Sequence, residues 1–313
     1  MNWGKTKTLL IVLLIAANLL AFSMYVGLKY DRTMLPEEMI ENAIENLSAR
    51  GVTVQNGAIM REKQSIPIYT AVKEKPENCM KRIERVLDVL INNEGEYYEK
   101  KVPDGIAAVK KAADGEASAF LTSNSRLTAI SSEISDSERE GVLGVDFSAV
   151  NSDYQPADKS CMKTVNRFYQ AVAKSTKRGM ASFGFRTLEV REHGDGTIVF
   201  CVQTADDIDL PAYTARFYFS SDDELLLADG EFFIGEAEKA YSAALLDGIN
   251  LIYRMELSEV SEIISESNAF SVIAIEGDSN YFVPSYSVIY KDKNGNIVNH
   301  IYDSVTGELK SKY

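Results

Sequence analysis

The residue types that most often carry catalysis are sparse and scattered in this chain. His193 and His300 are the only histidines, and neither accompanies a Gly-x-Ser-x-Gly serine, so no nucleophile–base pair is recognisable. His193 lies in a Gly-Asp-Gly turn, and His300 lies in an alternating segment that predicts an exposed strand position. There is no Gly-rich phosphate loop and no His-Glu-x-x-His helix. The pattern favours binding over catalysis, although active sites built from carboxylates alone leave no local signature.

Two acidic clusters contain the residue types of a cation site. Asp292, Asn294 and Asn296 resemble the first ligands of a calcium loop. The loop then needs a carboxylate near its end, but the following residues 297–300 predict a strand, so a hairpin turn explains the cluster better. The second cluster, residues 206–209, predicts a solvated loop before Pro211. We therefore expect no metal, no cofactor and no catalytic residue.

The cysteines also give no clear site. Cys79, Cys161 and Cys201 are odd in number and widely spaced, which does not resemble a disulfide framework, and no pair has metal-ligand spacing. Cys201 stands in an apolar strand pattern and is expected in the core. The sequence does not decide whether two of the three form a disulfide.

Composition restricts the classes of partner. The chain has 313 residues with 33 basic and 46 acidic side chains, a formal net charge of -13. This charge argues against nucleic acid, which requires a basic surface, and against binding flat on anionic lipid. An apolar fraction of 45% is that of a folded protein, long enough for one large or two ordinary domains.

One apolar segment, residues 9–28, contains no charged residue and is followed by Lys29 and Arg32. A run of about 20 residues is long enough for a membrane-spanning helix. A cleavable signal peptide is the alternative, with a weak cleavage pattern at residues 21–23, but the apolar run continues past it. We expect an uncleaved, single-pass anchor in the cell membrane, with residues 1–8 cytoplasmic and the bulk of the chain extracytoplasmic.

The expected anchor carries features that suit contact with a second helix. An amide near the middle of a bilayer gains from finding a partner group, and small residues four apart permit close approach of another helix. The alternative is that such residues are ordinary in spanning helices. The candidate partner-helix interface consists of Ala17, Asn18, Ala21, Ser23 and Gly27.

The remaining sequence predicts helices followed by antiparallel strands, twice. Apolar spacing predicts helices over residues 36–49, 79–92, 159–181 and 235–255. Strands are expected over 185–192, 197–204, 212–220, 225–234, 270–276, 281–290 and 297–302. Residues 136–158 lack periodicity and suggest a boundary. The expected fold class is α+β: a transmembrane helix at 9–28, then two helix-plus-antiparallel-sheet units of the YycH/PepSY-like kind, extracytoplasmic domains 30–150 and 151–313.

The two ends of the chain carry a family resemblance. Residues 1–7, which lead into an apolar helix containing Ala17-Asn18-Leu19-Leu20, resemble the start of YycI-type accessory proteins. Residues 199–203, 210–219 and 283–288 resemble strands of that family, although Tyr286 stands where tryptophan is more usual. Residues 302–308 resemble its final strand and turn, an ending shared with PepSY-like domains. The resemblance covers the anchor and roughly the second half.

The resemblance implies a role and partners. YycI-type proteins, with their YycH-type relatives, belong to the cell-wall two-component system of low-GC Gram-positive bacteria, and bind its membrane-bound sensor histidine kinase. It therefore implies a membrane-anchored regulator that modulates such a kinase, with a YycH-type protein as a further partner, no small-molecule substrate and no enzymatic activity. Two alternatives stay open: an extracytoplasmic envelope hydrolase or PepSY-like inhibitor module, and a structural subunit of an envelope complex.

Overall fold

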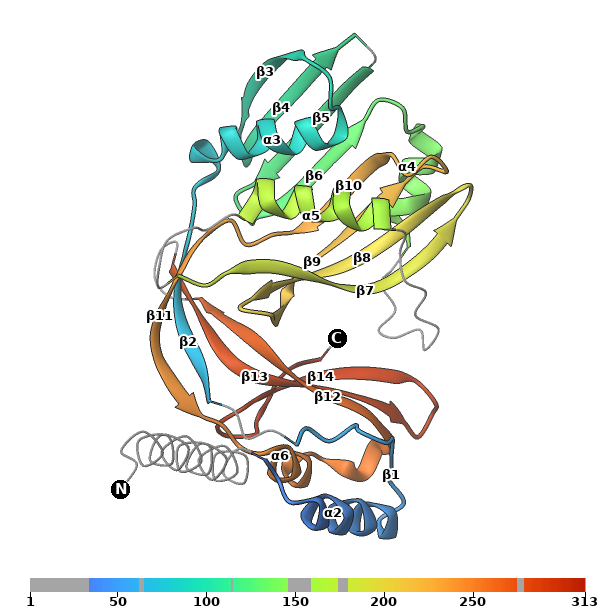
Figure 1. The fold of residues 1–313 in the computed structure, drawn as a ribbon, viewed down its shortest axis with the longest axis vertical. Coiled ribbons are helices and arrows are strands. Elements are labelled where there is room, and N and C mark those ends of the chain that lie inside the picture. The colour runs from blue at the N-terminus through green and yellow to red at the C-terminus, as the bar shows by residue number, and fades with distance from the viewer. Residues whose placement is uncertain are drawn as a thin grey trace, which may run out of the picture.

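The structure is a computed structural model, and it describes residues 34–61, 65–113, 115–145, 159–173, 180–274 and 279–312. The expected anchor, residues 9–28, and its candidate interface therefore lie outside the described residues. One 15-stranded sheet connects the described strands, ten of them in the order β11-β2-β13-β12-β9-β10-β6-β5-β4-β3. Figure 1 shows that these strands form two stacked layers.

The upper layer is built from two similar stretches of chain. Helix α3 (Met80–Leu90) precedes four antiparallel strands, and α5 (Lys159–Ala173) precedes four more. The two sets join where β6 pairs antiparallel with β10, and both helices lie along the sheet (Figure 1). The strands are β3 (Gly95–Val102), β4 (Gly105–Ala112), β5 (Gly115–Thr122), β6 (Arg126–Ser131), β7 (Phe183–His193), β8 (Gly196–Ala205), β9 (Ile208–Phe219) and β10 (Leu225–Glu231).

The core of the upper layer lies between these helices and the sheet. Val86 of α3 and Phe168 of α5 are fully buried against the strands, together with Phe217 and Phe232. The rings of Phe168 and Phe217 meet edge-to-face, with centroids 5.1 Å apart. The short helix α4 (Asp136–Leu143) packs on the end of the sheet, where Val142 joins a separate cluster with Phe200 and Tyr218.

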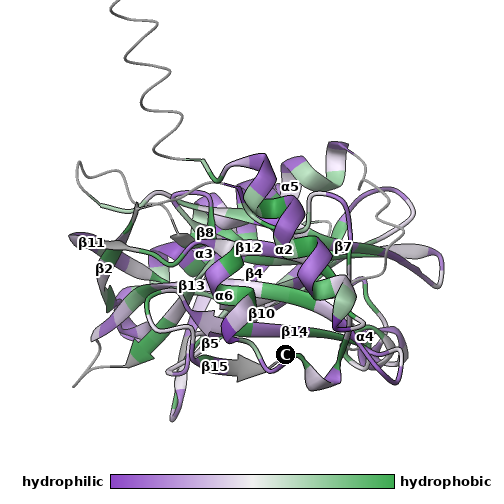
Figure 2. Ribbon diagram, turned by 90° about the horizontal axis from the view of Figure 1, so that it is seen from below, coloured by the Kyte–Doolittle hydropathy of each residue, from purple (hydrophilic) through white to green (hydrophobic). Residues whose placement is uncertain are grey.

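The lower layer combines the start and the end of the described chain. Helices α2 (Glu37–Ala49) and α6 (Gly248–Arg254) pack on its strands through Leu47, Ile252, Tyr286 and Tyr302. Figure 2 shows both hydrophobic and hydrophilic residues on α2, as expected of a helix with one buried face. The strands are β1 (Thr53–Val54), β2 (Ser65–Lys73), β11 (Gly235–Ala244), β12 (Val260–Ala274), β13 (Ser279–Asp292), β14 (Ile297–Asp303) and β15 (Leu309–Lys312).

An aromatic cluster joins the two layers. Phe233, just after β10, lies 5.0 Å from Phe282 of β13 between ring centroids, and Tyr69 of β2 meets Phe270 of β12 edge-to-face. All four rings are buried in one cluster. The direct strand connection is slight: β12 pairs with β9 in parallel at the single position Ala269↔Asp209.

The expected fold class is wrong. The described chain is not two successive helix-plus-antiparallel-sheet units, because its strands form one mixed sheet with parallel pairs β1·β12 and β9·β12. The early strand β2 lies between the late strands β11 and β13. Within the described residues, no helix has the length and apolar character needed to cross a membrane. The domain boundary near residue 150 stays a prediction, and strand pairing crosses it at β6·β10 and at β2·β11.

Individual elements agree with the sequence more closely than the fold class does. Helices α2, α3 and α5 occur at the predicted positions, as do strands β7–β10. The helix predicted over residues 235–255 is wrong: its first half is strand β11, and only residues 248–254 are helical, as α6. Pairing of β11 with β2 along nine register positions overrides the helical preference of its alanines, glutamates and lysine.

Candidate functional site

The histidines predicted to be unimportant for chemistry occupy different environments. His193 ends β7 at a hairpin turn, as expected, and its ring meets that of Tyr218 edge-to-face. His300, however, is only 6% exposed, so the predicted solvent exposure is wrong. Its ring lies between Tyr290 and Tyr302, with Nδ1 3.1 Å from the Tyr302 hydroxyl. This cluster belongs to the packing of β13 against β14.

The acidic turns are used by the fold itself. The Asp292 carboxylate accepts hydrogen bonds from the backbone N–H of Asn294 and of Asn296 within the β13–β14 hairpin, as a turn residue does. Asp206 is not merely solvated: it accepts hydrogen bonds from the Tyr69 hydroxyl and from the backbone N–H of Ser182. Asp209 forms an ion pair with Arg186. In the part of the chain that the structure describes, no three His, Cys, Asp or Glu residues are grouped as metal ligands.

A polar hollow of about 320 Å³ lies beside the C-terminal end of α3. Three carboxylates line it, Glu133, Asp223 and Glu224, and all three are exposed. Asp223 accepts hydrogen bonds from the hydroxyl of Ser160 and the thiol of Cys161, which hold the pKa of that carboxyl below its usual value. A general acid needs a raised pKa, which desolvation provides. The hollow therefore lacks the paired, desolvated carboxylates that an envelope hydrolase would require.

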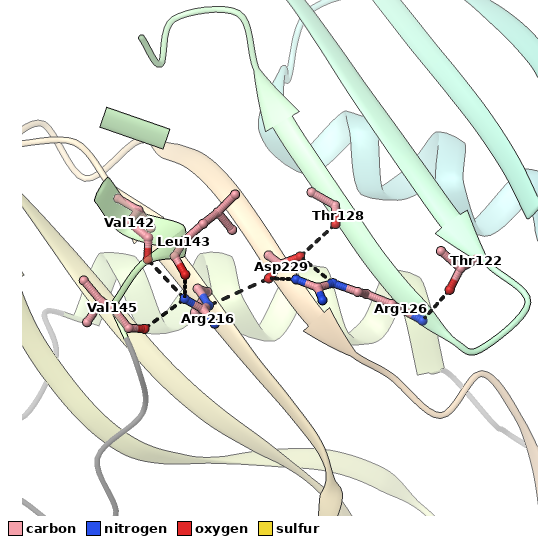
Figure 3. Close-up of polar contacts among 8 residues, drawn as sticks. All are labelled: Thr122, Arg126, Thr128, Val142, Leu143, Val145, Arg216 and Asp229. Atoms are coloured by element: carbon pink, nitrogen blue, oxygen red, sulfur yellow. Dashed lines mark hydrogen bonds and ion pairs between the residues drawn. The ribbon is translucent and has the colours of Figure 1, made fainter. Parts of the chain in front are cut away.

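A buried ion network stabilises the middle of the upper sheet (Figure 3). Asp229 of β10 is 2% exposed, and its two oxygens accept hydrogen bonds from the Arg126 guanidinium at 3.1 and 2.9 Å. The Thr128 hydroxyl donates a third, at 2.7 Å. Bonding to this carboxylate raises the pKa of Arg126. Asp229 therefore links β6 to β10 through these side-chain hydrogen bonds and its ion pair with Arg126.

Arg216 of β9 extends this network to α4. Its Nε lies 3.8 Å from Asp229, and its Nη1 donates to the carbonyl oxygens of Val142, Leu143 and Val145 at 2.8–3.1 Å (Figure 3). Carbonyls at the end of a helix have no partner within the helix and carry partial negative charge. A single guanidinium therefore ties the C-terminal end of α4 to the sheet.

A second buried carboxylate, Glu266 of β12, lacks such partners. Its side chain is 7% exposed, and one oxygen accepts a hydrogen bond from the backbone N–H of Met60 at 2.9 Å. The other oxygen, Oε1, has no hydrogen-bond partner among the described residues. Burial raises the pKa of this carboxyl to about 7. No sequence motif marks the residue, because its environment is created by segments far apart in the chain.

The lower layer carries an exposed apolar surface that we call the β2–β11 face. Ile273, Tyr281, Thr70 and Glu238 are successive partners across strands β12, β13, β2 and β11, so their side chains lie on one face. Val72 shares that face two positions after Thr70, and Tyr241 shares it on the other side of Thr70, where it pairs with the buried Ile68. The four large apolar side chains of the face are 39% to 63% exposed: Val72, Tyr241, Ile273 and Tyr281.

On β2 the side opposite the face is buried, whereas residues 238–242 of β11 are exposed on both sides of the strand. Tyr69 and Ala71 alternate with the exposed positions of β2 and pack in the aromatic cluster with Phe282. Strand β11 forms the margin of the sheet beside β2 (Figure 1). Among the described residues, its outer edge meets only Met180 and Ala181, at Glu238 and Ala237. The sequence of β2 already indicated apolar side chains on both faces of the strand, because β2 is apolar at nearly every position instead of at alternate ones.

The three cysteines are all buried and none of them forms a disulfide, and the burial agrees with the core position expected for Cys201. Cys201 is fully buried in strand β8, and burial raises the pKa of its thiol. Burial raises the pKa of the Cys79 thiol to about 12. Neither thiol has the lowered pKa that a reactive cysteine needs.

Comparison with known proteins leaves the assignment to a family open. No protein-family model matches the chain, and no curated protein matches it. A solved structure of an uncharacterized protein from Eubacterium rectale matches over 83% of this chain and 89% of its own, with 10% sequence identity and a TM-score of 0.48. This distant likeness carries no functional argument.

Proposed function

We propose that this protein is a non-catalytic regulator that acts by binding another protein, and that the β2–β11 face is its docking surface. The observation that supports this is the group of four large apolar side chains exposed on adjacent strands. Monomeric proteins rarely leave large contiguous apolar surfaces in water, and aromatic residues are enriched where proteins bind one another.

The charges around the face define the partner it suits. Glu236 and Glu238 lie on the same side of β11 as the apolar residues, since they pair with Val72 and Thr70. Lys73 and Lys239 pair with Gly235 and Tyr69 and therefore lie on the other side. The matching surface is a partner protein with aromatic or aliphatic side chains at its centre and basic residues at its rim.

The finer proposal is that this partner is the extracytoplasmic region of a sensor histidine kinase, with a YycH-type accessory protein in the same assembly. It rests on the resemblance of residues 1–7 and of the apolar segment 9–28 to YycI-type proteins. In this proposal the segment attaches the protein to the cell membrane. To change kinase activity, the regulator must bind one signalling state of the kinase more tightly than the other.

Site-specific photo-crosslinking in native membranes tests the proposal. A photoreactive amino acid replaces Tyr281 or Tyr241 on the β2–β11 face, and Tyr98 of β3 serves as a control that is also an exposed tyrosine. We expect crosslinks to one membrane protein from both face positions and none to it from Tyr98. Absence of crosslinks from both face positions would disprove the docking surface. A crosslinked protein that is not a sensor kinase would retain the surface and disprove the finer proposal.

A further inference from the structure

Glu266 connects three segments of the lower layer. Its backbone N–H donates to the carbonyl of Ala58 at 2.9 Å, and its side chain accepts from the N–H of Met60, so it holds residues 58–60 at both ends. On another side the carboxylate touches the start of α6: a Cβ added to Gly248 would lie 2.2 Å from Oε2. The close contact leaves no room for water between the carboxylate and the helix.

The groups that face this carboxylate make its ionisation unfavourable. From α6 the facing group is Asp247, whose carboxylate caps the helix by accepting from the N–H of Asn250 at 2.9 Å. From β13 it is Tyr286, whose hydroxyl donates to the carbonyl of Leu246 at 2.5 Å. Residues 58–60 offer only backbone. No described cation pairs with Glu266, and a buried charge without a counter-charge is costly.

We propose that Glu266 is a proton-operated latch, which holds residues 58–60 and the start of α6 against β12 when its carboxyl is neutral and releases them when it is ionised. The burial that raises its pKa to about 7 places the transition near neutral pH. Opening the latch lets water reach the carboxylate, which restores a pKa near its ordinary value of 4.5. Between these two pKa values each unit of rising pH therefore favours the open state by up to about tenfold, and above about 7 the effect is complete.

The latch is placed to influence the docking surface. Residues 58–60 lead into β2, which begins at Ser65, and β11 ends at Ala244, three residues before the Asp247 that caps α6. The start of β2 and the end of β11 pair with each other, so both strands are connected to the latch at the same end. This consequence for binding rests on the proposed function, whereas the latch itself is independent of it.

Amide hydrogen exchange of the full chain tests the latch directly. Protection factors, corrected for the intrinsic pH dependence of exchange, are measured at Met60 and Asn250 between pH 5.5 and 8.5. In the parent protein we expect protection at both amides to fall at least about tenfold with rising pH. The full shift from 4.5 to about 7 corresponds to about 300-fold, of which about 30-fold falls between pH 5.5 and 8.5.

Two variants separate the latch from a general effect of pH. Glu266→Gln keeps the shape without ionising, so its protection should not change with pH. Glu262→Gln, on the same strand and bonded to Gln55 of the same neighbouring segment, should behave as the parent does. If the Glu266→Gln variant does not fold, the carboxyl carbon of Glu266 is titrated by NMR in the parent. A parent whose protection is independent of pH, or a Glu266 that titrates near 4.5, would overturn the proposal.

Discussion

Asp229 of the upper layer and Glu266 of the lower layer are both buried carboxylates, but their surroundings are opposite. Asp229 in the upper sheet accepts three hydrogen bonds and has two arginines beside it. Glu266 in the lower layer accepts one and has a carboxylate and a phenol as its facing groups. The same chemical group therefore forms an ionic link in the upper layer and is a carboxyl with a raised pKa in the lower layer.

The two carboxylates differ in which structural elements supply the groups around them. Asp229 is surrounded by side chains of β6 and β9, which flank β10 on both sides, so cross-strand register supplies the cations. Glu266 faces a loop and a helix start, which supply backbone groups instead. Register gives the Asp229 carboxylate its cations, whereas burial without a counter-charge raises the pKa of Glu266.

The largest expected effect is the loss of the ionic link. Asp229→Ala leaves Arg216 half-buried without its carboxylate and removes three hydrogen bonds, so we expect the free energy of unfolding to fall by about 3–5 kcal/mol. Urea denaturation at pH 7 measures the change. Asp136→Asn removes an exposed ion pair with Arg139 and should change stability by less than about 0.5 kcal/mol. A loss below about 1 kcal/mol for Asp229→Ala would mean that the network is not important for the fold.

The second expected effect is a gain in stability on mutation, and its size depends on pH. A carboxyl whose folded-state pKa is raised binds its proton more tightly when folded, so its contribution is present below pH 4.5 and is lost as pH rises through about 7. Glu266→Gln cannot ionise and so avoids this loss of stability. We expect its free energy of unfolding to exceed that of the parent by up to about 3 kcal/mol at pH 8 and to differ little from it at pH 4.5. Urea midpoints measured across this range check it, and parallel curves for the two proteins would contradict it.

The smallest expected effect on stability concerns the β2–β11 face. Tyr241→Ser with Tyr281→Ser alters exposed residues, so the free energy of unfolding should change by less than about 1 kcal/mol. Binding to the crosslinked partner, measured by titration of the purified domains, should weaken at least about tenfold. Phe120→Ser, an exposed aromatic on β5, is the matched control and should leave binding unchanged. Equal binding by the double variant would place the docking surface elsewhere.

Local patterns in the sequence predicted helices α2, α3 and α5 and the β13–β14 hairpin, since these depend on neighbouring residues. Strand β11 could not be predicted locally, because pairing with β2 decides its conformation against helix-favouring residues. The ion pair between Arg126 and Asp229 could not be predicted from local sequence either, because the two residues are 103 positions apart. The docking face and Glu266 depend on the same long-range register. The anchor at 9–28 and its residues Ala17, Asn18, Ala21, Ser23 and Gly27 stay a prediction.

The insertion of β2 between β11 and β13 affects the order in which parts of the chain can fold. The upper layer uses residues 80–231, a continuous stretch, so it can form as soon as that stretch is available. Strand β2 must wait for partners such as Ser279, which pairs with Val72, and closing so long a loop is entropically costly and slow. The early segment that contains β2 therefore stays open to proteases and chaperones until the last quarter of the chain arrives. A C-terminal truncation would release an N-terminal strand while leaving the middle of the molecule folded.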